Sequence, residues 1–145
     1  MWAGYGATML GGLIVDFGGV LTDPDGGERI VAAVATARAH GLRTGLLSNA
    51  DNVDDAEGIF DDVLLAGSMR FGKPDIRVYL LAADRLGLTP EQCVFVDDVA
   101  AFVHGAVRAG MVGVHHHDVD TTLTELTALF GPWLTAPEMG PEWTR

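Results

Sequence analysis

Short apolar runs that alternate with segments of helical periodicity constrain this chain more than any other feature. The runs are almost continuously apolar, which is typical of strands buried on both faces of a parallel sheet. They lie at 13–17, 43–49, 63–66, 94–98 and 111–115, and the helical segments lie at 28–40, 75–86, 100–109 and 121–130. Strands that alternate with helices at these lengths predict right-handed βαβ units. We therefore expect an α/β fold, a Rossmann-like three-layer sandwich with a parallel central sheet.

The domain organisation follows from length and from a change in composition near the end of the chain. A chain of 145 residues suits a single domain with one core. We place that domain at residues 1–130. From Gly131 onward proline, glycine and tryptophan become frequent, so residues 131–145 are expected to form an irregular C-terminal tail. The last helix is expected to be N-capped by Asp120 or Thr121.

Charge, hydropathy and cysteine content exclude several classes of function. The formal net charge of -11 repels nucleic-acid phosphates, so we expect no nucleic-acid partner. The apolar runs are far shorter than the ~20 residues of a membrane span, and no basic leader precedes an apolar stretch. We expect a cytoplasmic protein with no membrane partner. Cys93 is the only cysteine, which excludes an internal disulfide, and its apolar neighbours predict a buried thiol.

Polar residues end three of the predicted strands. Asp16 closes the first apolar run, Ser48 lies near the end of the second, and Asp97 and Asp98 close the fourth. Lys73 stands just ahead of the helix at 75–86. In open α/β sheets ligands bind beyond the carboxyl ends of the strands, where these side chains would converge. The pattern therefore predicts a functional site rather than a set of unrelated loop caps.

Structural roles remain open for some of these residues. Ser48 could cap a turn, Lys73 could be a solvated lysine at a helix start, and Asp97 could be purely structural. The tract 115–117 is three histidines, but neighbours on a strand point to opposite faces, so we do not expect them to converge on one metal ion. Four acidic residues are expected to form a solvated surface: Asp54, Asp55, Asp61 and Asp62.

Four short motifs, in order, resemble those of the haloacid dehalogenase-like (HAD) hydrolase superfamily. The first is Leu13-Ile14-Val15-Asp16-Phe17-Gly18-Gly19-Val20-Leu21-Thr22, the second Leu46-Leu47-Ser48-Asn49, the third Gly72-Lys73-Pro74-Asp75, and the fourth Val94-Phe95-Val96-Asp97-Asp98 with Gly105-Ala106 and Ala109-Gly110-Met111. The resemblance spans roughly residues 13–114. It implies a HAD core and a hydrolase that acts on phosphomonoesters.

The resemblance also implies roles for individual residues. Asp16 would attack the phosphoryl group and form an aspartyl-phosphate that water then hydrolyses. Mg²⁺ would be bound by Asp16, Asp98 and the Gly18 carbonyl, with Asp97 acting directly or through a water.

The phosphate group would be held by a separate set of donors. Ser48 and the backbone amide of Asn49 would donate hydrogen bonds to it, and Lys73 would supply a fixed cation.

Three departures from the family pattern bear on activity. Phosphatases of this family commonly carry a second aspartate two residues after the nucleophile, which serves as general acid and base, and this chain has Gly18 there. Phe102 stands where related fourth motifs commonly have asparagine. Only residues 17–47 separate Asp16 from Ser48, which leaves no room for the usual helical cap.

Two functions are therefore weighed. The first is a capless, Mg²⁺-dependent phosphatase, slow because it lacks the second aspartate. Its open site would take a phosphorylated small molecule or a phosphoprotein, or a homo-oligomer would cover it. The alternative is a catalytically degenerate family member with a binding or regulatory role. A weaker third possibility is a phosphate-sensing or dimerising scaffold that uses the C-terminal tail as its contact.

Overall fold

The computed structural model describes residues 9–53 and 58–136 and contains one parallel sheet. Its strands are β1 (Gly12–Val15), β2 (Arg43–Ser48), β3 (Asp62–Leu65), β4 (Cys93–Asp97) and β5 (Val112–His115). Their order is β3-β2-β1-β4-β5, and every neighbouring pair is parallel. The predicted α/β class and parallel central sheet are confirmed.

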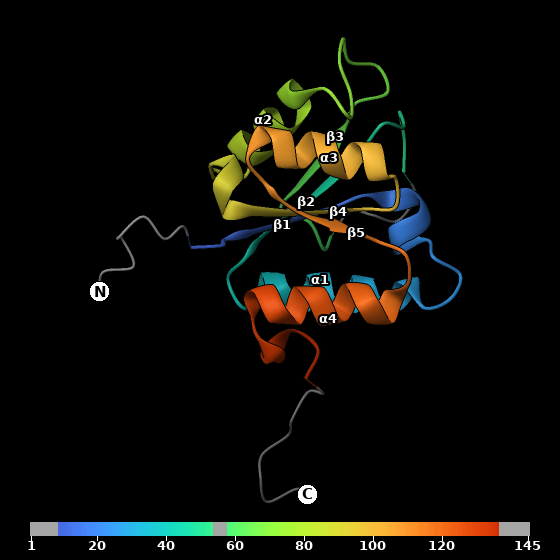
Figure 1. The fold of residues 1–145 in the computed structure, drawn as a ribbon, viewed down its shortest axis with the longest axis vertical. Coiled ribbons are helices and arrows are strands. Elements are labelled where there is room, and N and C mark those ends of the chain that lie inside the picture. The colour runs from blue at the N-terminus through green and yellow to red at the C-terminus, as the bar shows by residue number, and fades with distance from the viewer. Residues whose placement is uncertain (1–8, 54–57, 137–145) are drawn as a thin grey trace, which may run out of the picture.

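Helices cover both faces of the sheet, as Figure 1 shows. One face carries α1 (Gly27–Ala39) and α4 (Val119–Phe130), and the other carries α2 (Ile76–Arg85) and α3 (Ala100–Ala109). Single helical turns precede β4 and follow α4, at η2 (Pro90–Gln92) and η3 (Pro132–Leu134). Among the described helices, none combines the length and the apolar character that crossing a bilayer requires.

The sheet separates two hydrophobic cores, which explains the continuous apolar runs in the sequence. On β1, Leu13 and Val15 pack in the core beneath α1 and α4, whereas Ile14 packs in the core beneath α2 and α3. All three are at most 1% exposed. Because both faces of a central strand are buried, every position needs an apolar side chain and the usual period of two disappears.

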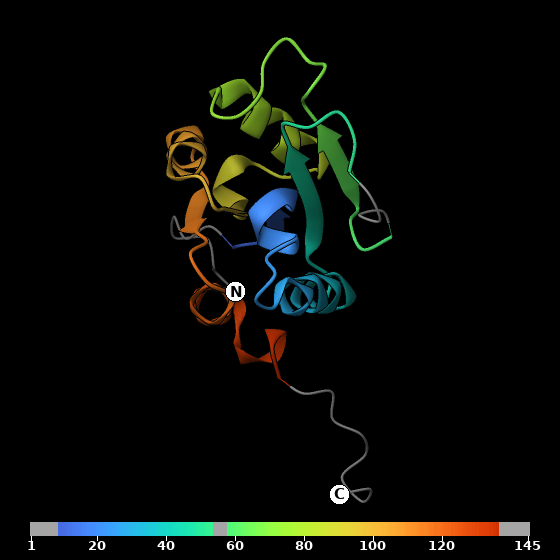
Figure 2. The same cartoon turned by 90° about the vertical axis from the view of Figure 1, so that its right-hand side faces the viewer.

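Strand order reverses at β1, and this places the predicted site. β2 and β3 lie on one side of β1 while β4 and β5 lie on the other, and Val15 is in register with both Leu46 and Val96. The residues that follow or close these three strands therefore meet at one edge. Figure 2 looks onto this edge, with the turn after β1 near the centre of the view.

The turn after β1 differs from the prediction. The apolar run was expected to be a strand through Phe17, but the strand ends at Val15 and a single helical turn, η1 (Phe17–Leu21), follows Asp16. The physical reason is the glycine pair. Gly19 adopts a φ of 80°, which side-chain-bearing residues rarely adopt, and its N–H donates to the Thr22 hydroxyl at 2.9 Å. This turn directs the chain back across the strand ends.

The start of α4 is a second correction. The expected N-caps were Asp120 or Thr121, but the helix begins at Val119 and its N-cap is Asp118. The Asp118 carboxylate accepts a hydrogen bond from the Thr121 N–H at 2.7 Å, which satisfies an amide that has no partner inside the helix. The sequence offers two aspartates two positions apart, and only the earlier one has the extended backbone of a cap.

No inserted domain separates the first two strands. Between β1 and β2 the chain contains only η1, α1 and their connecting loops, and between β3 and α2 it forms no helix. The expected absence of a cap at the first of these positions is therefore confirmed for the described chain.

Two further expectations fall partly outside the described residues. Of the tail predicted at 131–145, residues 137–145 lie outside them. In the described part, η3 buries Leu134, which is 2% exposed, in the core with α1 and α4. Of the predicted acidic surface, Asp54 and Asp55 lie outside, while Asp61 pairs with Arg38 and Asp62 pairs with Arg85.

Candidate active site

Lys73 lies at the centre of the cluster formed at the carboxyl edge of the sheet. Its Nζ donates to Asp16 Oδ1 at 2.9 Å, to Asp97 Oδ2 at 2.7 Å and to the Leu47 carbonyl at 3.1 Å. The lysine side chain is 1% exposed. The alternative role of a solvated helix-start lysine is therefore wrong, because the ammonium group is buried and holds two strand ends together.

The backbone of Lys73 is fixed by a side chain from the neighbouring strand end. Asn49 Oδ1 accepts from the Lys73 N–H at 2.9 Å, and Asn49 Nδ2 donates to the Lys73 carbonyl at 3.0 Å. The rings of Phe95 and Phe102 lie 5.6 Å and 5.1 Å from Nζ, within the range of cation–π attraction. Asn49 was expected to act only through its backbone amide, and this structural role of its side chain was missed.

Three carboxylates converge beside the lysine. One oxygen from each of Asp16, Asp97 and Asp98 lies within 4.8 Å of the others. Asp97 is buried and also accepts from the Val99 N–H at 3.0 Å, whereas Asp98 is exposed. With all four groups ionised, three carboxylates and one ammonium carry a local charge of -2. Within residues 9–53 and 58–136, no other set of three acidic, histidine or cysteine side chains is so arranged.

Burial perturbs the two inner carboxylates. Removal from water raises the pKa of Asp16, and the Lys73 ammonium opposes that rise. Burial likewise raises the pKa of Asp97 to about 6, again against the attraction of Lys73. Raised carboxylate pKa values in a polar cluster at a strand end are typical of functional sites.

The two glycines after Asp16 have different steric surroundings. A Cβ atom on Gly19 would collide with the Asp98 carboxylate, so the turn and the acidic cluster are in close contact there. A Cβ on Gly18 would meet no atom within 4 Å, and its φ of -68° and ψ of 129° suit any residue. Gly19 is thus required by packing, whereas the surroundings of Gly18 would accept a side chain.

Ser48 is the last residue of β2 and lies next to the cluster, but its hydroxyl forms no hydrogen bond with the described carboxylates. The hydroxyl oxygen accepts from the Ala50 N–H at 3.1 Å, so the turn-capping role is present. The hydroxyl proton is still available as a donor. The structure thus brings Asp16, Lys73, Asp97 and Asp98 into one cluster, with Ser48 on the adjoining strand end.

The histidine tract contributes no common site. His115 Nε2 bonds the Asp98 carbonyl at 3.0 Å, while His116 points into the protein towards Asp23 and Thr122. His117 is exposed and its ring lies 4.1 Å from that of His115. As expected, neighbouring residues of the tract point to opposite sides.

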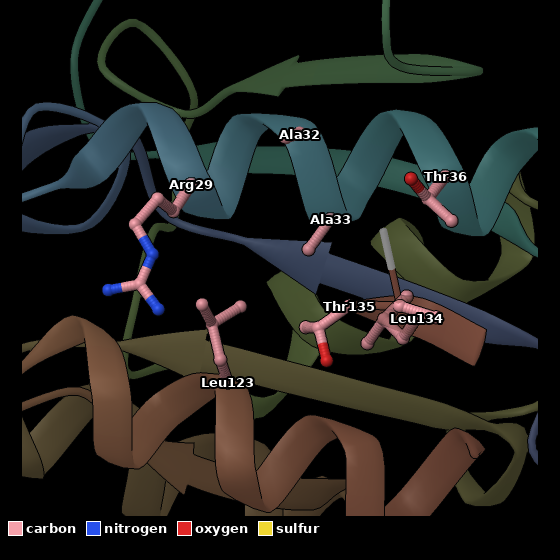
Figure 3. Close-up of a pocket in the computed structure, with 8 residues that line it drawn as sticks. Arg29, Ala32, Ala33, Thr36, Leu123, Leu134 and Thr135 are labelled. Atoms are coloured by element: carbon pink, nitrogen blue, oxygen red, sulfur yellow. The ribbon is translucent and has the colours of Figure 1, made fainter. Parts of the chain in front are cut away.

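Cys93 and a cavity between two helices lie apart from this site. The thiol is buried, as predicted, and burial raises its pKa to about 11, so it is not a thiolate at neutral pH. A cavity of about 220 Å³ lies between α1 and α4. Among the residues that line it, Arg29 lies at one end and Leu123 and Leu134 form part of the walls (Figure 3). None of the candidate site residues lines it.

Comparison with known proteins decides the family. The model of the haloacid dehalogenase-like hydrolases matches residues 26–110, more than half of the chain. The chain belongs to this family. Phosphatase MT3486 of Mycobacterium tuberculosis is 36% identical over 88 residues, which are 54% of this chain and 41% of that protein. Mouse acyl-CoA dehydrogenase family member 10 is 30% identical over 106 residues, 68% of this chain. The match spans less than half of the first relative and 10% of the second.

Two solved structures share the fold of this chain. An uncharacterized protein from Corynebacterium glutamicum aligns with a TM-score of 0.77 and 37% identity, covering 84% of this chain and 96% of its own. The HAD family enzyme BT-2542 from Bacteroides thetaiotaomicron, solved with magnesium and inorganic phosphate, aligns with a TM-score of 0.61, covering 79% of this chain and 98% of its own. Its identity is 14%, so this second likeness shows the fold alone.

Proposed function

We propose that this chain is a capless, Mg²⁺-dependent phosphomonoester hydrolase with Asp16 as its nucleophile. The observation that carries the proposal is the buried Lys73 ammonium, bonded to both Asp16 and Asp97 beside the exposed Asp98. Such an arrangement holds one carboxylate in a fixed position at an open strand edge. Membership of a hydrolase family whose relatives include phosphatases supports the reaction class.

The acidic cluster fits Mg²⁺ by its chemistry. The donors are carboxylate oxygens, which magnesium prefers, and the local charge of -2 would balance the charge of +2 on the ion. Asp16, Asp98 and the Gly18 carbonyl would hold it. Asp97 already bonds Lys73 and the Val99 N–H, which favours contact with the ion through a water. When bound, the ion would offset negative charge on the phosphoryl group.

The reaction of the chain's own residues follows from these positions. A carboxylate oxygen of Asp16 attacks phosphorus and the bond from phosphorus to the ester oxygen breaks, so that an aspartyl-phosphate forms. The alcohol leaves as an alkoxide that takes a proton from solvent. Water then attacks phosphorus, releasing inorganic phosphate and the Asp16 carboxylate. Lys73 favours the ionised form of Asp16 and orients its carboxylate. Together with the Ser48 hydroxyl and the backbone N–H of Asn49, Lys73 would stabilise charge on the phosphate.

Gly18 sets the expected rate. No carboxyl group stands two residues after Asp16 to protonate the leaving oxygen or to activate water. A positioned acid or base contributes ~10²–10⁴-fold, so we expect slow turnover and a preference for substrates with good leaving groups. Because no cap encloses the edge in the part of the chain that the structure describes, the substrate would be a phosphorylated small molecule or a phosphoprotein, and a homo-oligomer could cover the site.

The alternative proposal is a degenerate HAD protein that binds a ligand without turnover. Gly18 and Phe102 favour it, since the first removes the acid and the second places an apolar ring 5.1 Å from Lys73 Nζ where relatives commonly have an asparagine. Such a protein would still bind phosphate and Mg²⁺ at the same cluster.

Hydrolysis of para-nitrophenyl phosphate and acetyl phosphate, with and without Mg²⁺, tests the proposal. Both substrates have good leaving groups and need little help from a general acid. We expect slow, Mg²⁺-dependent release of phosphate that disappears in Asp16→Asn and persists in Asp84→Asn, an exposed aspartate on α2 that serves as the matched control. Absence of turnover in the wild type would favour the binding role instead.

A further inference from the structure

A second buried polar cluster lies beside the candidate site and is not part of it. His116 Nε2 lies 2.7 Å from Asp23 Oδ2, and His116 Nδ1 lies 2.7 Å from the Thr122 hydroxyl. The side chain of His116 is 2% exposed and that of Asp23 is 13% exposed. Asp23 lies in the loop before α1, His116 directly follows β5, and Thr122 lies in the first turn of α4. His116 and Asp23 are 93 positions apart in the sequence.

The Asp23 carboxylate determines the direction of its bond to His116. A carboxylate can only accept, so the Nε2 atom of His116 carries the proton that it donates to Asp23. The backbone N–H of Asp25 and the imidazole together lower the pKa of Asp23, which keeps it an acceptor. The order aspartate, histidine, hydroxyl resembles a nucleophile triad, but Thr122 is 1% exposed and no substrate can reach its hydroxyl.

The cluster joins two segments that carry the candidate site. Asp23 lies two residues after η1 ends. Within this turn the Gly19 N–H donates to the Thr22 hydroxyl, and Gly19 packs so closely against Asp98 that a Cβ atom would collide with its carboxylate. The backbone N–H of His116 donates to the backbone carbonyl of Asp97, at the end of β4, at 2.8 Å. His116 is thus the link through which the turn after Asp16 is tied to the strand end that carries Asp97.

We propose that His116 is a positioning residue that, through Asp23 and Thr122, fixes the turn at 17–23 against the end of β4 and so sets the spacing of the acidic cluster. The inference rests on the proposed function, because it concerns the same cluster. Loss of the link would loosen the turn and weaken metal binding while leaving Asp16, Asp97, Asp98 and Lys73 unchanged.

Hydrogen–deuterium exchange and Mg²⁺ titration of the folded chain test the link. His116→Leu removes both side-chain bonds at similar volume, and Thr122→Val removes one bond with almost no change of shape. Thr122→Ser keeps the hydroxyl and should restore wild-type behaviour. Thr44→Val is the matched control, since Thr44 is 0% exposed and its hydroxyl donates to the Ile59 carbonyl near the opposite end of β2.

We expect about tenfold faster exchange at 17–23 in both link variants, the size expected when a buried hydrogen-bond partner is lost. The Mg²⁺ concentration that half-maximally stabilises the protein should rise about tenfold, as for other residues that orient metal ligands. Thr44→Val should change neither quantity. Unchanged exchange at 17–23, or an equal change in Thr44→Val, would overturn the inference.

Failure of the proposed function gives a different result. If Mg²⁺ does not stabilise the wild-type protein, the proposed metal site is wrong, and the exchange comparison alone then decides whether His116 holds the turn. Should His116→Leu fail to fold, the comparison of Thr122→Val with Thr122→Ser carries the test.

Discussion

Replacing Lys73 by methionine removes a buried cation while nearly preserving side-chain volume. The ammonium donates to Asp16 and Asp97, whose side chains are 12% and 0% exposed, so neither carboxylate can recover full hydration. Breaking a buried pair by removing one partner destabilises a protein by about 3–5 kcal/mol, because a charge remains buried without compensation. We expect Lys73→Met to lower the free energy of unfolding by an amount in this range at pH 7.5.

The loss of stability in Lys73→Met should depend on pH, because both carboxylates that lose their partner can bind a proton. Burial already raises the pKa of Asp97 to about 6 and raises that of Asp16, and loss of Lys73 raises both further. The folded variant then binds protons that the unfolded chain releases, so its stability increases as the pH falls towards the unfolded-state pKa. Each proton contributes up to ~1.4 kcal/mol per pH unit, and we expect the deficit relative to wild type to shrink by about 1–3 kcal/mol between pH 7.5 and pH 5.5.

Urea unfolding of both proteins at the two pH values measures this difference. Arg85→Met is the matched control, because the Arg85–Asp62 pair is partly exposed, with side chains 42% and 20% accessible. Its loss should cost less than about 1 kcal/mol at either pH. A Lys73→Met deficit below about 1 kcal/mol, or one that is the same at both pH values, would refute the reasoning.

Three more substitutions follow from the packing of the site and the core. Gly18→Asp, which has open space at its Cβ, should raise kcat on substrates with poor leaving groups by up to ~10²–10⁴-fold, and an unchanged kcat would show that the position cannot supply the acid. Gly19→Ala strains a φ of 80° and collides with Asp98, so Mg²⁺ titration should show weaker binding and urea unfolding a loss of about 1 kcal/mol or more. Leu126→Ala should cost about 2–5 kcal/mol in the same unfolding assay without weakening Mg²⁺ binding.

The parallel sheet and the meeting of the site residues at one edge could be predicted, because both follow from the local pattern of apolar residues along the chain. Apolar residues at every position of 13–15 identify a strand buried on both faces, and Leu13 and Ile14 do enter different cores. Once strands at 13–15, 43–48 and 93–97 are recognised as parallel, their carboxyl ends must share an edge. The meeting of Asp16 and Asp97 therefore follows from topology, before any side-chain geometry is known.

The contacts that hold the site together could not be predicted because they join distant positions. Asn49 bonds the backbone of Lys73 across 24 residues, and the sequence carries no signal that its side chain, rather than its amide, faces that loop. His116 reaches Asp23 across 93 residues. A histidine after a strand predicts neither its burial nor its partner, since both depend on how α4 and the loop before α1 pack.

The boundaries that were wrong share a physical cause. Phe17 continues the apolar pattern, but backbone freedom at Gly18 and Gly19 lets the chain turn immediately after Asp16. At α4, the choice between Asp118 and Asp120 as N-cap depends on backbone dihedral angles that composition does not specify. The pattern of apolar residues therefore identifies the strands and helices, whereas their ends depend on the backbone conformation of single residues.

Trapping the phosphorylated enzyme tests the central claim most directly. Without a carboxyl group at position 18 to activate water, hydrolysis of the intermediate should be slow, so it should accumulate with acetyl phosphate and Mg²⁺. After acid quenching, mass spectrometry of the peptide that contains Asp16 should show an added phosphoryl group in the wild type and none in Asp16→Asn. An unmodified peptide in the wild type, or equal labelling of Asp16→Asn, would contradict Asp16 as the nucleophile.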